Sequence, residues 1–185
     1  MTSQAITALA DMLSPHVPLG KTRLETLCLL IIGVISARTV NLSHVACERS
    51  GEVLIASTYR RLQRFFQHVA LGEDWSAGLV IRLLGLSGPW NLCLDRTNWK
   101  IGGRDVNILM LAVATRRFRV PLMWTVLDKA GNSNTQERVA LMQRYLALFG
   151  ADSVRLLLAD REFIGLKWLN FLNGKNISFA IRVKA

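Results

Sequence analysis

Apolar residues follow two different periods along this chain, and the change falls near residues 86–89. Before that point, apolar positions recur three and four residues apart, which is typical of amphipathic helices. After it, runs in which apolar and polar residues alternate predict strands, with two helical segments between them. The pattern predicts a helical region over residues 1–86 and a mixed α/β region over residues 87–185.

In the helical region, an almost unbroken apolar run predicts a buried helix over residues 22–39. Asn41 is expected to cap a short helix, and Ser57 is expected to cap a helix over residues 58–68. In the latter, Leu62, Phe65, Phe66 and Val69 recur at helical spacing.

The opposite side of that helix is expected to carry Arg60, Arg61 and Arg64. Three helices ending in an arginine-faced one would suit a small helix-turn-helix-like module, in which these arginines contact DNA phosphates. The alternative is an ordinary amphipathic helix with a solvated basic face. The spacing alone favours this alternative, because no turn signature fixes the helix pair.

The second region is expected to run β-β-β-α-β-α-β. The first three strands form an antiparallel meander, and the later ones are added in parallel through helices. Asn134 or Thr135 is expected to cap the first helix, and Gly150 to end it. The predicted strands are residues 91–100, 106–116, 118–129, 154–160 and 177–184.

Two apolar runs in this region each lead to a single aspartate, Asp95 and Asp160. In a β-β-β-α-β arrangement the fourth strand returns beside the first, so the two carboxylates are expected to stand side by side. A divalent cation would offset their repulsion, and magnesium favours carboxylate ligands. Two such ions about 4 Å apart could clamp an in-line phosphoryl displacement. The pair is therefore a candidate catalytic and metal-binding site.

Each aspartate also has a simpler interpretation. Asp95 could pair with Arg96 or Arg161, and Asp160 could cap the following turn. Glu162 is expected to form a salt bridge or a cap rather than to bind metal. The residues available to hold a phosphate backbone near the aspartates are Arg96, Lys100, Arg104, Arg161 and the basic tip at residues 116–119.

Composition strengthens the case for a polyanionic partner. The 23 Lys and Arg residues exceed the 13 Asp and Glu residues and give a formal charge of +10, which favours nucleic acid first and an anionic membrane second. Three cysteines without a CxxC pair indicate neither a disulfide framework nor a zinc site, and fit a reducing compartment. The apolar run at residues 27–37 is too short for a membrane span, and no signal peptide is expected.

Several stretches resemble the DDE-type transposases of bacterial insertion sequences, in the group with a Tyr-Arg-Glu-Lys signature. In the second half they are Leu-Asp-Arg-Thr-Asn-Trp at 94–99, the apolar strand at 107–113, Val-Pro-Leu at 120–122 and Ala-Asp-Arg-Glu-Phe at 159–163. In the first half, Asn-Leu-Ser at 41–43 and Tyr-Arg-Arg-Leu-Gln-Arg-Phe-Phe at 59–66 are similar to the DNA-binding helices of such enzymes.

The resemblance implies a ribonuclease-H-like domain over residues 87–185, in which Asp95 and Asp160 are the first two acids of the triad and bind two Mg²⁺ ions. It also implies binding to the terminal inverted repeats of a transposon, a homodimer within a synaptic complex, and a place on DNA in a bacterial cytoplasm. No membrane partner is expected.

The third acid of that family is a glutamate within Tyr-x2-Arg-x3-Glu-x6-Lys, and no acidic residue follows Glu162 here. The expectation is therefore a partial ribonuclease-H-like domain from a truncated transposase, with strand cleavage absent or very weak. The alternatives are a non-catalytic DNA-binding fragment that interferes with a full-length transposase, and a basic peripheral membrane protein that uses residues 27–37.

Overall fold

The computed structural model describes residues 2–51 and 53–183, which fall into two compact units. One unit is Met1–Trp75 and the other is Ser76–Ala185. The boundary lies eleven residues before the predicted one at residue 86. The difference arises because helix α5 (Ala77–Leu83) packs in the core of the second unit through Ala77 and Ile81.

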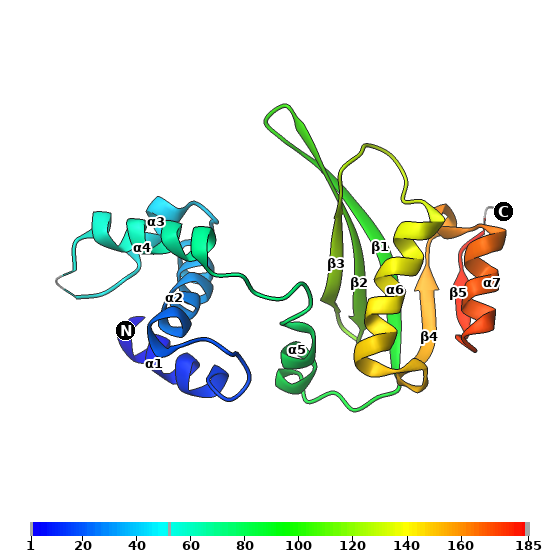
Figure 1. Cartoon of the computed structure of the whole chain (residues 1–185), viewed down its shortest axis with the longest axis horizontal. Coiled ribbons are helices and arrows are strands. Elements are labelled where there is room, and N and C mark those ends of the chain that lie inside the picture. The colour runs from blue at the N-terminus through cyan, green and yellow to red at the C-terminus, as the bar shows by residue number, and fades with distance from the viewer. Residues whose placement is uncertain (1, 52, 184–185) are drawn as a thin grey trace. The chain divides into compact units, whose positions relative to one another are not determined.

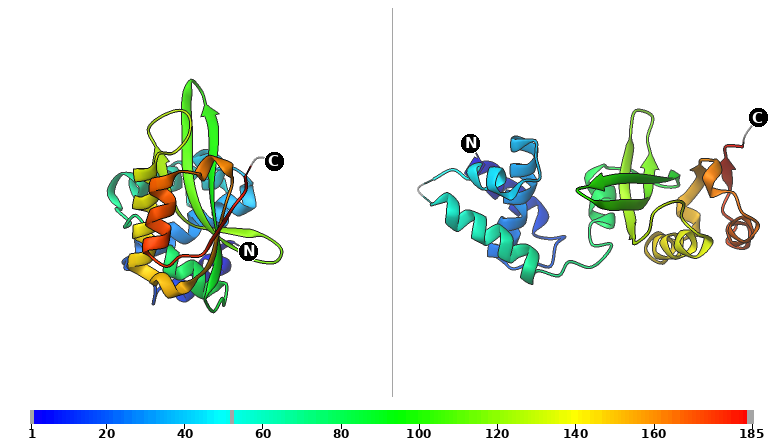
Figure 2. Two further views of the ribbon diagram at one scale, coloured as in Figure 1. Left: turned by 90° about the vertical axis from the view of Figure 1, so that its right-hand side faces the viewer. Right: turned by 90° about the horizontal axis from the view of Figure 1, so that it is seen from above.

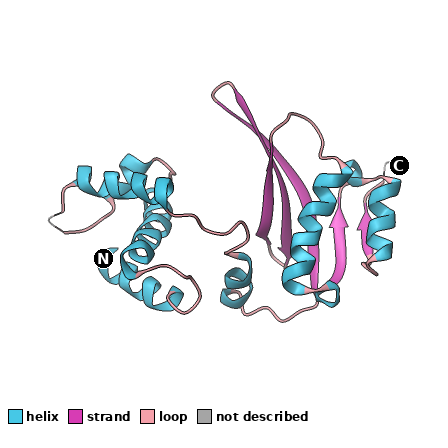
Figure 3. Ribbon diagram, viewed as in Figure 1, coloured by secondary structure: helices cyan, strands magenta, loops and turns pink. Residues whose placement is uncertain are grey.

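The described part of the first unit consists of helices (Figures 1 and 3). These are α1 (Thr2–Leu13), α2 (Lys21–Ala37), α3 (Leu42–Cys47) and α4 (Ile55–His68). Helix α2 is the predicted buried helix, and its Gly33 lies so close to Val45 of α3 that a methyl group there would be 2.7 Å from Val45 Cγ1. No helix in the described residues is long and apolar enough to cross a membrane.

The caps of the first unit differ from the prediction in one case. Asn41 caps α3 as predicted, with its side chain accepting a hydrogen bond from the Ser43 N–H at 3.0 Å. The predicted cap at Ser57 is wrong, because α4 begins at Ile55 and has Leu54 at its N-cap. Buried Thr58 continues the apolar stripe of α4 back by one turn, so the helix starts earlier than the polar signal suggested.

The second unit is built on one sheet of five strands, so the predicted mixed α/β class is confirmed. The sheet order is β3-β2-β1-β4-β5, with β1 antiparallel to β2 and parallel to β4. The strands are β1 (Trp90–Ile101), β2 (Arg104–Ala114), β3 (Arg119–Leu127), β4 (Val154–Ala159) and β5 (Phe179–Ile181). The last is shorter than the predicted strand 177–184, whose final residue lies outside the described residues.

Helices α6 (Thr135–Phe149) and α7 (Leu166–Gly174) cover one face of this sheet (Figures 1 and 2). Asn134, not Thr135, caps α6, because its side chain accepts from the Glu137 N–H while the Glu137 carboxylate accepts from the Asn134 N–H. Gly150 ends the helix as predicted.

The hydrophobic core lies between this face and the helices. Leu92 and Leu94 of β1 and Leu157 of β4 belong to it, together with the fully buried Tyr145 and Trp168 of the two helices. Because side chains alternate along a strand, residues between these leucines point to the opposite face of the sheet.

Candidate functional site

Asp95 directly follows Leu94, and Asp160 directly follows Ala159; Leu94 and Ala159 are register partners on neighbouring strands. Leu94 of β1 lies opposite Ala159 of β4 in a parallel ladder, which is the last pairing of these two strands. In a parallel pair, residues in register point to the same face. The first aspartate therefore continues β1 beside the second, on the face away from α6 and α7.

Both aspartates line one open cavity of about 680 Å³ on that face. Its wall also contains side chains from β1, β4 and β5 and from the residues that follow them. The cavity-lining residues on the outer face are Cys93, Asp95, Leu158, Asp160, Ala180 and Arg182, joined by Arg119 at the start of β3. The cavity thus combines two carboxylates with two guanidinium groups.

Cys93 lines the same cavity, and the charged groups there affect its thiol. Burial raises the pKa of the Cys93 thiol; the nearby Arg119 cation acts in the opposite direction, and the Asp95 carboxylate raises it further. An uncharged thiol is therefore favoured in this cavity. The cations and carboxylates that also line it are left to meet a polar ligand.

Each aspartate accepts one hydrogen bond from the next backbone N–H. The distances are 2.8 Å from Arg96 N to Asp95 Oδ1 and 2.7 Å from Arg161 N to Asp160 Oδ1. The second bond caps the short helix η2 (Arg161–Phe163), so the capping role considered for Asp160 is present. Within the described residues neither carboxylate forms a salt bridge, so oxygen lone pairs remain on both.

Two carboxylates alone would not complete a metal site. Across residues 2–51 and 53–183, no group of three His, Cys, Asp or Glu side chains is placed to hold a metal ion. Magnesium commonly keeps several waters and uses only one or two carboxylates, so the pair fits that ion with substrate oxygens or further ligands completing the shell. Its role as a magnesium ligand set stays a prediction.

Arg96, although adjacent to Asp95 in sequence, points to the other face of the sheet. Its Nη2 forms a 3.0 Å ion pair with Oε2 of Glu162, and the guanidinium is mostly buried. This is the salt bridge expected of Glu162, but it separates Arg96 from the cavity. The structure therefore does not bring Arg96 to the aspartates, because successive side chains of a strand alternate. The predicted phosphate contact is not supported by this position.

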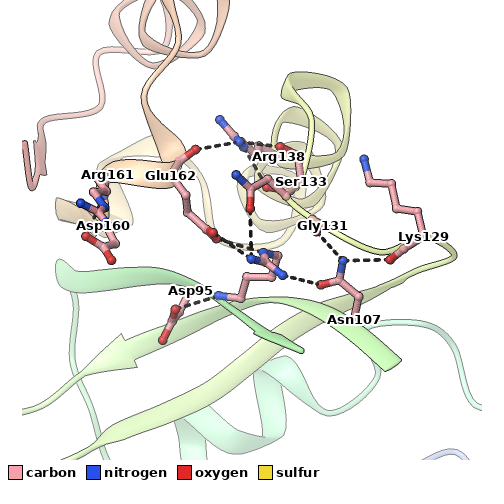
Figure 4. Close-up of polar contacts among 11 residues, drawn as sticks. Asp95, Asn107, Lys129, Gly131, Ser133, Arg138, Asp160, Arg161 and Glu162 are labelled. Atoms are coloured by element: carbon pink, nitrogen blue, oxygen red, sulfur yellow. Dashed lines mark hydrogen bonds and ion pairs between the residues drawn. The ribbon is translucent and has the colours of Figure 1, made fainter. Parts of the chain in front are cut away.

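Arg161 and Lys100 are exposed, as phosphate contacts require, but they lie in different places. Arg161 directly follows Asp160 at the start of η2 (Figure 4), and Asp160 itself lines the cavity. Lys100 lies near the end of the β1–β2 hairpin, where its register partner is Asp105. Only the first of these cations is close to the candidate metal site.

In the first unit the three arginines of α4 do not share one environment. Arg61 faces α2: its Nε donates to Thr26 Oγ1 and its Nη2 donates to the Thr22 carbonyl, both at 2.7 Å. It also lies 3.5 Å from Glu25. Arg60 and Arg64, four residues apart, are exposed. The cation of Arg61 therefore holds α4 to α2, whereas Arg60 and Arg64 are the exposed members of the predicted basic side.

Arg64 lines a second cavity, of about 360 Å³, between α2 and α4. Arg23, Arg61 and His68 line it as well, and none of its described lining residues is acidic. A groove with this lining suits a phosphate group better than a cation.

Two features of the sequence passed unnoticed in the site prediction. Arg182 reaches the cavity because the end of β5 pairs with β4, a register that no local pattern indicates. Asn107 is fully buried within an otherwise apolar strand and accepts a hydrogen bond from Arg96. A lone polar residue inside an apolar run was the available signal for the latter.

Comparison with protein-family models and with curated proteins gives no match. Among solved structures, the chain is similar to a chain in the cryo-EM structure of the simian T-cell lymphotropic virus intasome in complex with PP2A regulatory subunit B56 gamma. That similarity has a TM-score of 0.43 and 10% sequence identity, and it covers 68% of this chain. It spans 43% of the other chain, less than half of that protein's length. A TM-score below 0.5 does not establish a shared fold.

Proposed function

We propose that this chain is part of a metal-dependent DNA strand-cleaving and strand-transfer enzyme of the DDE transposase kind. The observation that carries the proposal is the placement of Asp95 and Asp160 after register partners of adjacent parallel strands, on one face and in one cavity. Two carboxylates so close in the fold repel unless a cation lies between them. The stretches around them are those that resemble insertion-sequence transposases.

In this proposal, Asp95 and Asp160 hold Mg²⁺ through the oxygen lone pairs that their backbone hydrogen bonds leave free. When bound, the ion supplies stabilisation of the negative charge that develops on phosphodiester oxygens during cleavage. The expected number is two ions in a site completed by a third acid. The ribonuclease-H-like fold that the resemblance implies belongs to the same proposal.

The cations of the cavity are then phosphate contacts. Arg119 and Arg182 line the same cavity as the carboxylates, and Arg161 lies beside Asp160. Within the described residues no hydrogen bond or ion pair occupies these three guanidinium groups, so each can meet a phosphate oxygen. Their charge would orient a DNA strand with its phosphate toward the two aspartates.

The first unit is proposed to bind the ends of a transposon. Exposed Arg60 and Arg64 are its candidate phosphate contacts, and the groove lined by Arg23, Arg64 and His68 lies beside them. Binding of this kind is driven by counterion release and must weaken steeply as salt rises.

A second candidate function is DNA binding without catalysis. It is favoured by one specific observation: no third metal-binding side chain joins the two aspartates in the described part of the chain. In that case the protein would occupy transposon ends and interfere with a complete transposase.

The test is to incubate the protein with supercoiled plasmid and Mg²⁺ or Mn²⁺, and to compare it with a version extended by a helix that carries the Tyr-x2-Arg-x3-Glu-x6-Lys segment. Asp95→Asn and Asp160→Asn controls accompany both forms. If the extended form nicks the plasmid and each aspartate substitution abolishes the nicking, the enzymatic function is supported. Salt-sensitive DNA binding that survives Asp95→Asn, with no nicking by either form, supports the non-catalytic function.

A further inference from the structure

Arg96 and Glu162 form a bidentate ion pair on the face of the sheet opposite Asp95. Besides the Nη2–Oε2 contact at 3.0 Å, Arg96 Nε donates to Glu162 Oε1 at 3.2 Å. The two side chains are only 14% and 22% exposed. A paired fork of this kind fixes both groups in direction as well as distance, unlike a mobile surface pair.

The pair joins the chain just beyond the two candidate metal ligands. Arg96 directly follows Asp95, and Glu162 lies two residues after Asp160. The β1–β4 ladder ends one residue before each aspartate. Where the backbone ladder stops, the side-chain pair continues the connection between the two segments.

Arg96 is itself held by two asparagines. Its Nη1 donates to Asn107 Oδ1 at 3.3 Å, and its Nη2 donates to Asn132 Oδ1 at 3.1 Å. Buried Asn107 uses its Nδ2 to donate to the Lys129 and Gly131 carbonyls at 3.0 and 2.8 Å. Its amide oxygen is therefore turned toward Arg96. Figure 4 shows these contacts converging, with Glu162 directed into the cluster and Asp95 and Asp160 outside it at one side.

Glu162 is held from α6 as well. Arg138 donates to the Glu162 carbonyl at 3.0 Å and to Ser133 Oγ at 2.9 Å, and its guanidinium lies over the Phe163 ring at 5.1 Å. Only 5% of Arg138 is exposed. The turn that follows Asp160 is thus fixed from both its backbone and its side chain.

We propose that Arg96 and Glu162 are positioning residues that set the separation and direction of the Asp95 and Asp160 carboxylates for a divalent cation. This inference rests on the function proposed above. It assigns Arg96 a role other than phosphate contact. Groups that orient metal ligands without touching the metal change affinity by about 10–100-fold when they are substituted.

The test is to titrate the full chain with Mn²⁺ and to measure binding by the relaxation rate of water protons. The principal variant is Arg96→Lys, which keeps the net charge but cannot form the bidentate fork. We expect its Kd for Mn²⁺ to rise about ten-fold with an unchanged circular dichroism spectrum. Arg155→Lys is the matched control, because it makes the same change at an exposed position of β4. Its Kd should equal that of the unaltered protein.

If Arg96→Lys does not give a native spectrum, Asn132→Ala serves instead, because it removes one hydrogen bond at an exposed residue and leaves the ion pair. We then expect about a two- to three-fold rise in Kd. A folded variant whose Kd is unchanged overturns the positioning role.

Failure of the proposed function looks different in the same experiment. If the unaltered chain binds no Mn²⁺, or if Asp160→Asn leaves binding intact, the metal site itself is wrong. If Asp160→Asn abolishes binding while Arg96→Lys, or Asn132→Ala in its place, folds and leaves the Kd unchanged, the metal site stands and only the positioning role is overturned.

Discussion

Leu94 and Ala159 are register partners at the end of a parallel ladder, and each is followed directly by an aspartate. This relationship places Asp95 and Asp160, 65 positions apart in the sequence, at one cavity on one face of the sheet. A strand register therefore creates a candidate cation site from two otherwise ordinary carboxylates.

We expect Asp95→Asn and Asp160→Asn each to raise the Kd for Mn²⁺ by at least about ten-fold, because half of the carboxylate charge of the site is lost. The free energy of unfolding should change by less than about 1 kcal/mol, since both side chains are exposed and asparagine can still accept the hydrogen bond from the next backbone N–H. Asp152→Asn, at an exposed position of the short helix before β4, is the control and should leave metal binding unchanged. A normal Kd in either site variant would contradict the prediction.

Two arginines of α4 should separate stability from DNA binding. Arg61→Ala removes two 2.7 Å hydrogen bonds to α2 and should lower the free energy of unfolding by about 1–3 kcal/mol. Arg60→Ala removes an exposed cation and should leave stability within about 0.5 kcal/mol. In a salt series of DNA binding, Arg60→Ala should reduce the slope of log K against log salt by about one. Equal effects of the two variants on stability would contradict the assignment.

The contact between α2 and α3 should not tolerate a methyl group. In Gly33→Ala the new carbon would lie 2.7 Å from Val45 Cγ1 and 3.3 Å from the Val45 carbonyl oxygen. We expect a loss of about 1–3 kcal/mol in chemical denaturation, as for other overpacked sites. Gly78→Ala in α5 is the matched control, since nothing lies within 4 Å of its added carbon. It should be neutral or stabilising by up to about 1 kcal/mol.

Tyr145 should make stability depend on pH in the alkaline range. Burial raises the pKa of Tyr145 to about 12, although the hydrogen bond with Ser153 acts in the opposite direction. Between pH 10 and 12 the unfolded chain loses the phenolic proton while the folded chain keeps it. Stability from this group is therefore complete below about pH 10 and is lost as pH rises toward 12, by about 1.4 kcal/mol per pH unit.

The check is to measure the free energy of unfolding between pH 9 and 12 for the unaltered chain and for Tyr145→Phe. The variant should lose about 1 kcal/mol at neutral pH with its 2.8 Å hydrogen bond to Ser153. Above pH 10, the free energy of unfolding of the variant should fall less steeply with pH, by the contribution of one proton. Parallel curves for the two proteins would exclude Tyr145 as the source.

Particular elements show how far sequence reasoning reached. The buried helix α2, the Asn41 cap, the end of α6 at Gly150 and the strand β4 all follow from local signals: apolar period, a capping side chain and a glycine stop. Helix α5 was missed, because seven residues offer too little periodicity, and with it the boundary between the units was misplaced. The cap predicted at Ser57 was wrong because serine, although a good capping residue, here lies inside a helix.

For the candidate site, the sequence by itself determined which residues carry charge and that Asp95 and Asp160 each follow an apolar run. Only the tertiary structure decided which charges meet. Sheet register brought the aspartates into one cavity with Arg182, and side-chain alternation sent Arg96 to the opposite face to pair with Glu162. In the same way, the helical rotation between successive residues directs the Arg61 side chain toward α2 and leaves that of Arg60 exposed. The physical reason is that local patterns follow from neighbours along the chain, whereas the facing of a charge follows from distant strands and helices that exist only after packing.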